Sequence, residues 1–161
     1  MSVVLVTGSS SGIGLATALH FARQGWDVHA GVRNPATAAE LQQAIAAEKL
    51  PITPVTIDVD DAGSIASGVG EVLARAGRID ALVNNAGIGG GGAIEDVPVD
   101  WAKSLFETNY FGAIRMTQAV LPGMRDRRAG AIVKCELDRR SAGHRRARPL
   151  LRGEARPRGN Q

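Results

Sequence analysis

The residues best suited to chemistry lie near the start of the chain, where three glycines follow an apolar run of a strand's length. Gly8, Gly12 and Gly14 have the spacing G-x-x-x-G-x-G, and a helical pattern of apolar residues follows them. Gly8 permits a tight exit from the strand where a Cβ would clash, and Gly12 lets a ligand approach the backbone. Gly14 lets the new helix pack closely on its strand. These residues predict a turn shaped for a ligand.

An anion is the ligand that such a turn favours. The free N–H groups and the positive dipole end of the helix would face it, so the pattern predicts a pyrophosphate site. The spacing differs from the G-x-G-x-x-G of the best-known dinucleotide fingerprint. A glycine-rich strand-to-helix turn that holds no ligand is the alternative, because such motifs also occur where nothing binds.

Strands and helices alternate along the chain, as the positioning of such a turn requires. Short β-branched runs predict strands at 2–7, 27–32, 52–57, 79–83 and 130–133. Helical spacing predicts helices after residue 14, after Pro35, from Asp60 or Asp61 to about Ala76, and from 99 to about 127. Right-handed crossovers then make the fold α/β, with a doubly wound parallel sheet that binds ligands at the carboxyl ends of its strands.

The last helical region, 99–127, contains apolar residues at core-facing spacing and an expected break near Thr108-Asn109. The predicted core positions are Leu105, Phe106, Ile114, Met116, Val120 and Leu121. The fifth strand follows directly, and the globular pattern stops there. We therefore expect one domain over 1–134.

Composition favours a protein of the cytoplasm with no membrane or metal partner. No apolar stretch is long enough to cross a bilayer, and the start of the chain lacks a basic leader and a cleavage site. The single cysteine, Cys135, excludes an internal disulfide framework, and the three histidines lack ligand spacing, so no metal site is predicted.

The positive charge is concentrated at the end of the chain. Residues 135–161 hold eight arginines and three acidic residues, whereas 1–134 hold 11 basic and 13 acidic residues. This basic tail has too little apolar surface to offset its ordering entropy, so we expect 135–161 to be disordered. It lacks aromatic stacking residues and a binding motif, which disfavours an arm for nucleic acid.

Three motifs together resemble the short-chain dehydrogenase/reductase family. Residues 7–14, Thr-Gly-Ser-Ser-Ser-Gly-Ile-Gly, match its T-G-x-x-x-G-[IL]-G turn, and residues 84–87 match its N-N-A-G motif. Asp58-Val59 ends the third strand, where the family contacts adenine. The resemblance implies a Rossmann-like fold that is incomplete at its C-terminus, because the family continues past the fifth strand. It implies these cofactor-binding residues: Gly8, Ser10, Ser11, Gly12, Ile13, Gly14, Arg33, Asp58, Val59, Asn85, Ala86 and Gly87.

Three residues of these motifs also have ordinary structural interpretations. Asp58 is equally well explained as a solvated carboxylate at a strand end. Asn84 and Asn85 are common turn formers, because asparagine tolerates left-handed geometry and bonds its own backbone.

Arg33 bears on the choice of cofactor. Dinucleotide folds select NAD with an acidic residue at the end of the second strand, and here Val32 and Arg33 occupy that place. A guanidinium binds a 2′-phosphate bidentately, so NADP is the expected cofactor, with NAD as the alternative. Ser11 argues against this preference, since many NADP-preferring relatives carry a second basic residue there.

Asn109 lies in a segment that resembles the family's helix bearing the asparagine of an Asn-Ser-Tyr-Lys tetrad. The resemblance implies a catalytic role for Asn109 in proton transfer beside hydride transfer between nicotinamide and an alcohol or carbonyl carbon. A polar residue at a helix kink is the alternative. The tetrad's serine and its Tyr-x-x-x-Lys motif are absent, because the one tyrosine is Tyr110 and the last lysine is Lys134. We therefore expect an inactive member of this oxidoreductase family.

The coding sequence of residues 135–161 offers an explanation for the missing serine, tyrosine and lysine. Synonymous codons can be chosen for residues 134–141 so that the same bases, read in the frame shifted by one base, encode Asn-Ala-Ser-Ser-Thr-Ala-Gly. Codons for residues 149–155 can be chosen in the same way to encode Pro-Tyr-Cys-Ala-Ala-Lys. The serine, tyrosine and lysine then fall at positions 137, 150 and 154, so a frameshift near codon 134 is the leading hypothesis.

The alternative functions are a dinucleotide-binding protein without catalysis and an interaction protein. A homo-oligomer is compatible with the family, although its interface would be affected by the altered end.

Overall fold

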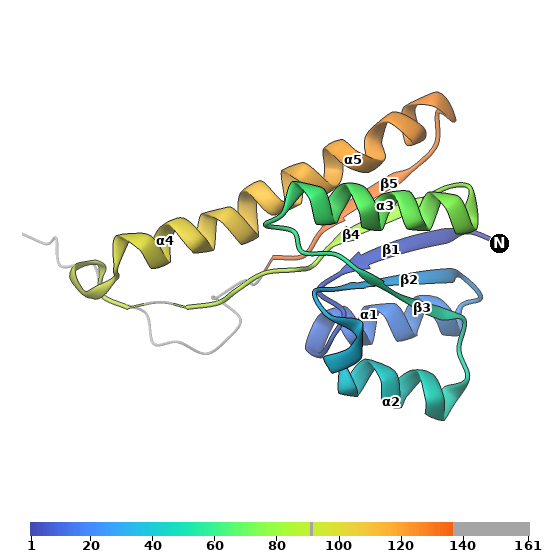
Figure 1. Ribbon diagram of the computed structural model, residues 1–161, viewed down its shortest axis with the longest axis horizontal. Coiled ribbons are helices and arrows are strands. Elements are labelled where there is room, and N and C mark those ends of the chain that lie inside the picture. Colours follow the sequence, from blue (N-terminus) through green and yellow to red (C-terminus); the bar gives the residue numbers. More distant parts are fainter. Residues whose placement is uncertain (91, 137–161) are drawn as a thin grey trace, which may run out of the picture.

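A computed structural model describes residues 1–90 and 92–136, and these form one parallel sheet covered by helices (Figure 1). The strands are β1 (Val3–Thr7), β2 (Asp27–Val32), β3 (Ile52–Thr56), β4 (Ala81–Asn84) and β5 (Ala131–Lys134), in the spatial order β3-β2-β1-β4-β5. This confirms the predicted doubly wound α/β class. The expected disorder of the tail and the reframed positions 137, 150 and 154 lie outside the described residues.

Helices cover both faces of the sheet. The α-helices are α1 (Gly12–Arg23), α2 (Ala39–Glu48), α3 (Ala62–Ala76), α4 (Val99–Phe106) and α5 (Ala113–Asp126). Short 3₁₀ turns occupy η1 (Pro35–Thr37) and η2 (Ile94–Asp96), and the π-helical turn η3 (Glu107–Gly112) joins α4 to α5. In Figure 1, α1 and α2 lie on one face and α3 and α5 on the other.

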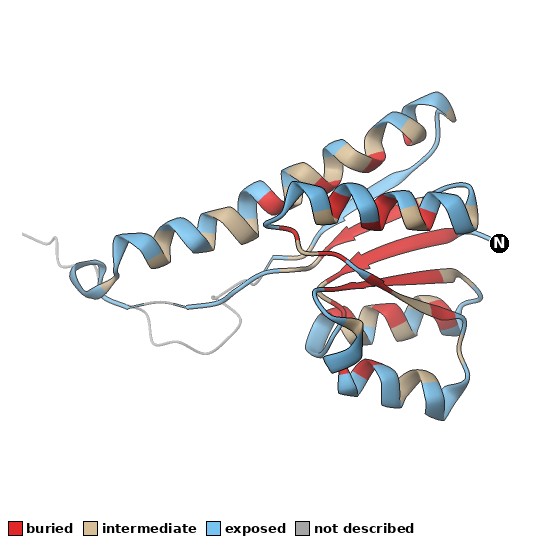
Figure 2. Cartoon of the chain, viewed as in Figure 1, coloured by how far each residue is buried: buried red, intermediate tan, exposed pale blue. Residues whose placement is uncertain are grey.

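The alternation of side chains along β1 explains this arrangement, because both faces of a parallel sheet are buried. Val3 and Leu5 join a core cluster with residues of α3 and α5, whereas Val4 and Val6 join a second cluster with α1 and α2. All five residues of β1 are buried. At the sheet's edge, all four residues of β5 are exposed (Figure 2).

The long helical segment agrees with the prediction in its division and differs in its core residues. The α-helices α4 and α5 are separated at the predicted place, Thr108-Asn109, by the π-helical turn η3, and the three together form one rod that runs past the end of the sheet (Figure 1). Phe106 and Ile114 are 59% and 38% exposed, so their assignment to the core was wrong. Phe106 lies in α4, outside both core clusters, and Ile114 borders a small cavity between α5 and β5, whereas Met116 and Val120 belong to the core cluster that α3 and α5 share with β1.

The start of the fourth strand differs from the prediction by two residues, since β4 begins at Ala81 rather than Ile79. Of the two predicted caps for α3, the structure has Asp61, which accepts hydrogen bonds from the amides of Gly63 (2.6 Å) and Ser64 (3.1 Å). None of the helices in the described ranges is both long and apolar enough to cross a membrane.

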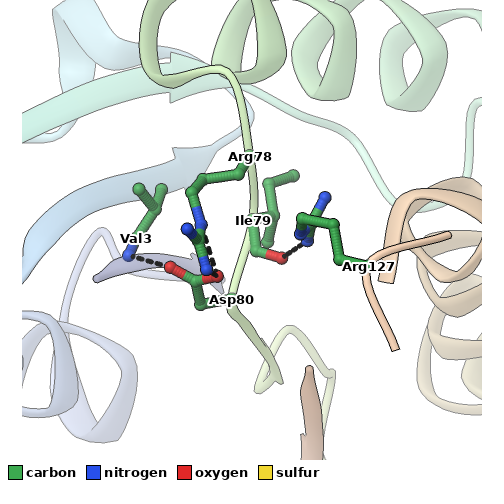
Figure 3. Close-up of polar contacts among 5 residues, drawn as sticks. All are labelled: Val3, Arg78, Ile79, Asp80 and Arg127. Carbon is green, nitrogen blue, oxygen red and sulfur yellow. Dashed lines mark hydrogen bonds and ion pairs between the residues drawn. The ribbon is translucent and has the colours of Figure 1, made fainter. Parts of the chain in front are cut away.

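A polar cluster joins the elements at the amino end of the sheet (Figure 3). The Asp80 carboxylate accepts hydrogen bonds from the Val3 amide (2.9 Å) and from Nε of Arg78 (2.7 Å). Arg127, just after α5, donates to the carbonyl of Ile79 at 2.7 Å. The cluster therefore joins β1, the segment before β4 and the end of α5 at the amino ends of the strands, opposite the candidate site.

Candidate functional site

A cavity of about 820 Å³ opens at the carboxyl ends of the strands, where the doubly wound topology predicts a ligand site. Its lining comes from the β1–α1 turn, the end of β2, the β3–α3 loop, the segment after β4, and η3. These predicted site residues line it: Gly8, Ser10, Ser11, Ile13, Gly14, Arg33, Asp58, Val59, Asn85, Ala86, Gly87 and Asn109. Gly12 lies in the same turn without contributing to the lining.

The glycines of the β1–α1 turn are fixed by geometry. Gly8 has φ +67°, and a Cβ there would lie 2.7 Å from Cα of Ala86, so the tight exit from the strand requires glycine. A Cβ on Gly14 would lie 2.2 Å from the carbonyl oxygen of Gly8, which explains the close approach of α1. Gly12 has φ +58° and open space around it.

At the amino end of α1, no side chain of the first turn offsets the positive end of the helix dipole. Ser11 is the N-cap residue, yet its side chain makes no capping hydrogen bond, and the first turn contains no acidic residue. Ser10 and Ser11 are exposed, and Ile13 and Gly14 of the first turn line the cavity. The amides of this turn that have no partner among the described residues are therefore available to an anion in the cavity.

Thr7 organises the junction between β1 and β4, and it was not among the predicted site residues. Its buried hydroxyl donates to the carbonyl of Val83 (3.3 Å) and accepts from the amides of Asn85 and Ala86 (both 3.0 Å). These three bonds use the hydroxyl's full capacity. The Thr that begins the first motif was the signal that could have identified it.

The Asn85 side chain completes the same junction. Its Nδ2 donates to the carbonyls of Thr7 (2.9 Å) and Gly8 (3.1 Å), so the amide group holds the glycine turn against the end of β4. Asn84 is buried, and its Nδ2 donates to Oγ1 of Thr117 on α5 at 3.3 Å. Both asparagines therefore have structural roles beside any contact with a ligand.

Arg33 is exposed at the rim of the cavity, directly after β2. It forms no ion pair with any residue in 1–90 or 92–136, so its guanidinium is available to an anionic ligand. The preceding Val32 is 3% exposed and belongs to the core. The position where a carboxylate would select NAD is thus filled by a buried apolar side chain.

The β3–α3 loop borders the cavity with Asp58, Val59 and Asp60. Oδ1 of Asp58 accepts from the Asp60 amide (3.1 Å), and the Asp58 amide donates to Oγ of Ser64 (2.9 Å), so Asp58 is held in an ordered turn. Val59 is 6% exposed and its side chain packs in the core beside Gly112.

Asn109 lies in η3 and binds the chain that leaves β4. Its Oδ1 accepts from the Ile88 amide (2.8 Å), and its Nδ2 donates to the Ile88 carbonyl (2.9 Å). This reciprocal pair fixes the segment that follows Gly87, and a Cβ on Gly87 would approach Oδ1 of Asn109 to 3.0 Å. The catalytic role of Asn109 stays a prediction.

Tyr110 lies outside the main cavity. It is 50% exposed and borders a separate cavity of about 230 Å³ between α5 and β5, together with Ile114, Thr117 and Ile132. Lys134 borders both cavities and pairs with Glu136 at 3.5 Å. Within the described part of the chain, the main cavity therefore has no tyrosine in its lining.

Comparisons with known proteins agree with these motifs. The profile of the family described as short chain dehydrogenase matches residues 2–136. Dehydrogenase/reductase SDR family member 7B of Bos taurus is 41% identical over 138 residues, covering 82% of this chain and 42% of that protein. Retinol dehydrogenase 8 of Bos taurus is 40% identical over 135 residues, covering 81% of this chain and 42% of that protein.

Solved structures give the same result. A short-chain dehydrogenase from Streptomyces avermitilis aligns with a TM-score of 0.76 at 39% identity, over 83% of this chain and 48% of the other. An actinorhodin polyketide ketoreductase determined with NADPH aligns with a TM-score of 0.74 at 37% identity, over 83% and 52%. The chain spans about half the length of the curated relatives it matches.

Proposed function

Because the chain belongs to the short-chain dehydrogenase family, we propose that it binds a nicotinamide dinucleotide, with NADP(H) preferred over NAD(H), in the 820 Å³ cavity. The observation that carries this proposal is the uncapped amino end of α1, which lines that cavity beside an arginine without an ion-pair partner in the described chain. The cavity is within the size range of cofactor sites. A related ketoreductase has been solved with NADPH, which supports the same ligand.

Each part of the dinucleotide has residues that suit it. The pyrophosphate would lie on the backbone of Ser10–Gly14 at the helix end, and Arg33 would bind the 2′-phosphate. The Asp58 carboxylate is an acceptor suited to the amino group of adenine, and the backbone of Val59 borders the same region. Asn85, Ala86 and Gly87 would line the nicotinamide half.

The bound cofactor would supply a hydride to a carbonyl carbon or accept one from an alcohol. Small carbonyl or alcohol compounds are the substrate class we propose for the intact family architecture. In this chain Asn109 holds the wall of the cavity through the Ile88 backbone. A side chain that exchanges a proton with the substrate oxygen contributes typically 10²–10⁴-fold to such a reaction. We propose that this chain, which lacks a Tyr-x-x-x-Lys motif, binds the cofactor without catalysing turnover at an enzyme's rate.

Two variants with matched controls test cofactor binding by calorimetry. Gly12→Val should abolish NADPH binding, because a β-branched residue at φ +58° is strained and would distort the turn whose amides are proposed to hold the pyrophosphate. Gly25→Val is the control: it imposes the same strain at φ +81° at the opposite end of α1, also in open space. NADPH binding by Gly12→Val equal to that of Gly25→Val would refute the phosphate assignment.

Arg33→Ala should weaken NADPH by about 1–3 kcal/mol while leaving NADH nearly unchanged, because the lost contact is charge-assisted. Arg125→Ala is the control, since Arg125 is exposed and does not border the cavity. Equal losses for NADPH and NADH would show that Arg33 does not bind the 2′-phosphate.

Catalysis requires a paired assay. The chain and a version with one base removed near codon 134 are compared with NADPH and a panel of carbonyl compounds. We expect turnover only from the reframed protein, together with cofactor binding by both. Equal turnover by both proteins would overturn the proposal that this chain is inactive. If neither binds the cofactor, an interaction protein becomes the better description.

A further inference from the structure

The turn η3 touches two loops that form opposite parts of the cavity wall. On one side Asn109 holds the backbone of Ile88, after β4. On the other side Oγ1 of Thr108 donates to Oδ2 of Asp60 at 2.8 Å, across 48 residues of sequence. Neighbouring residues of one helical turn thus bind different loops, and all four residues border the cavity.

The contact with Asp60 continues to Asp58. The Asp60 carboxylate accepts from Thr108, and the Asp60 amide donates to Oδ1 of Asp58 at 3.1 Å. Asp60 is exposed and makes no ion pair with another described residue. In the described structure, therefore, the Thr108 hydroxyl is the group that fixes the Asp60 carboxylate, and through it the turn that carries Asp58.

Packing brings η3 close to the same loop at a second point. A Cβ on Gly112 would lie 2.9 Å from Cγ2 of Val59 and 3.1 Å from the Val59 carbonyl oxygen, so the backbone of η3 lies directly on the loop. Glu107 and Arg115 form an ion pair that spans η3. The turn therefore meets the β3–α3 loop at Thr108 and at Gly112, and Thr108 supplies the polar contact.

We propose that Thr108 is a positioning residue that couples the adenine side of the cavity to the segment held by Asn109. Through Asp60 it orients Asp58 toward the adenine amino group, and through η3 it keeps Asn109 on the Ile88 backbone. The first half of this inference rests on the proposed function, because it assumes a dinucleotide in the cavity. The second half concerns the free protein and is testable without a ligand.

The experiment uses the full chain with Thr108→Val, which keeps the β-branched shape and removes the hydroxyl, and with Thr108→Ser, which keeps the hydroxyl. Ser104→Ala is the control, because among the described residues the Ser104 hydroxyl bonds only the carbonyl of Asp100, within α4. Two quantities are measured in each protein. One is the exchange rate of the Ile88 amide without ligand. The other is the ratio of dissociation constants for NADPH and its hypoxanthine analogue, which lacks the amino group.

For Thr108→Val we expect Ile88 exchange and the dissociation constant for NADPH each to rise about three- to tenfold, the range for an exposed hydrogen bond to a carboxylate. The factor by which this variant prefers NADPH over the hypoxanthine analogue should fall. Thr108→Ser and Ser104→Ala should have the Ile88 exchange rate and the dissociation constants of the wild type. Asp60→Ala should reproduce the effect, and the double variant should be no worse than either single variant. Wild-type values in Thr108→Val for both quantities would overturn the inference.

The two proposals fail in different ways. A wild-type chain that binds neither nucleotide refutes the proposed function, and Ile88 exchange then still decides the coupling. If Thr108→Val does not fold, Asp60→Ala and Thr108→Ser carry the comparison, since Asp60 is exposed. Loss of NADPH affinity without any loss of adenine discrimination would show that Thr108 does not act through Asp58.

Discussion

Removing the Asp80 carboxylate, which lies at the amino ends of the strands and away from the cavity, should lower the free energy of unfolding. In Figure 3 the carboxylate lies between the Val3 amide and the Arg78 guanidinium, with Arg127 nearby. Its side chain is 14% exposed, whereas that of Arg78 is 49% exposed. In Asp80→Ala, the Val3 amide of a buried strand loses its acceptor, at a cost of about 1–3 kcal/mol. The half-exposed contact with Arg78 adds only about 0–1 kcal/mol, so we expect a total loss of about 1–4 kcal/mol.

The pH dependence separates the charge from the hydrogen bond. Burial raises the pKa of Asp80, but the Val3 hydrogen bond and the Arg78 contact, aided by the positive charges of Arg78 and Arg127, outweigh it and leave the pKa lowered. A carboxyl whose folded pKa lies below its unfolded value of about 3.9 contributes stability above that pH. The contribution is lost as the pH falls through the folded pKa. Asp80→Asn should therefore differ from the wild type at pH 7 and converge with it below about pH 4.

Urea unfolding followed by the fluorescence of Trp26 and Trp101 measures these differences. Asp126→Asn is the control, because Asp126 is exposed at the end of α5 and makes no ion pair with another described residue. Asp80→Ala with the same urea midpoint as the wild type would refute the argument from the Val3 amide. A difference between the wild type and Asp80→Asn that stays constant from pH 7 to pH 3 would refute the argument from charge.

Three further predictions concern single side chains. His29 is 2% exposed, and its pKa is lowered chiefly by burial. The wild type should therefore lose stability as the pH falls below the unfolded pKa of about 6.5. The urea midpoint of His29→Leu should change little between pH 7 and pH 5. Gly14→Ala should lose NADPH binding in calorimetry because its Cβ would lie 2.2 Å from a carbonyl oxygen, whereas Gly70→Ala, in open space on α3, should stabilise the protein by about 1 kcal/mol. Thr7→Val leaves two amides unpaired and should lower the free energy of unfolding by about 2–4 kcal/mol, with Thr7→Ser close to the wild type.

The sheet was predictable because its determinants are local. Five β-branched runs, separated by helical patterns, specified the number of strands and the parallel class. Strand ends were less predictable, since they depend on contacts from elsewhere in the chain. Ile79 and Asp80 have the composition of a strand start, yet β4 begins at Ala81, and Asp80 uses its side chain to bind Val3.

The segment from α4 to α5 shows what periodicity cannot determine. Apolar spacing identified Met116 and Val120 as core residues correctly, but it assigned Phe106 and Ile114 to the same core. A helix pattern indicates which face is apolar and not whether a strand lies beneath that face. The sequence placed an interruption near Thr108-Asn109 correctly, but apolar spacing did not indicate that it would be a π-helical turn whose residues Thr108, Asn109 and Gly112 contact distant loops.

The site shows a related division between motif residues and ligand contacts. Thr7, Asn85 and Asn109 are polar motif residues, and in the structure their side chains bind backbone atoms of neighbouring loops. Gly8 and Gly14 are required by the close approach of backbone segments. Much of the motif therefore builds the shape of the cavity, and the groups left to bind a ligand are the amides of the α1 end, Arg33 and Asp58. It follows that the motifs predict the shape of the cavity well, whereas the proposed preference for NADP(H) rests on few side chains, chiefly Arg33.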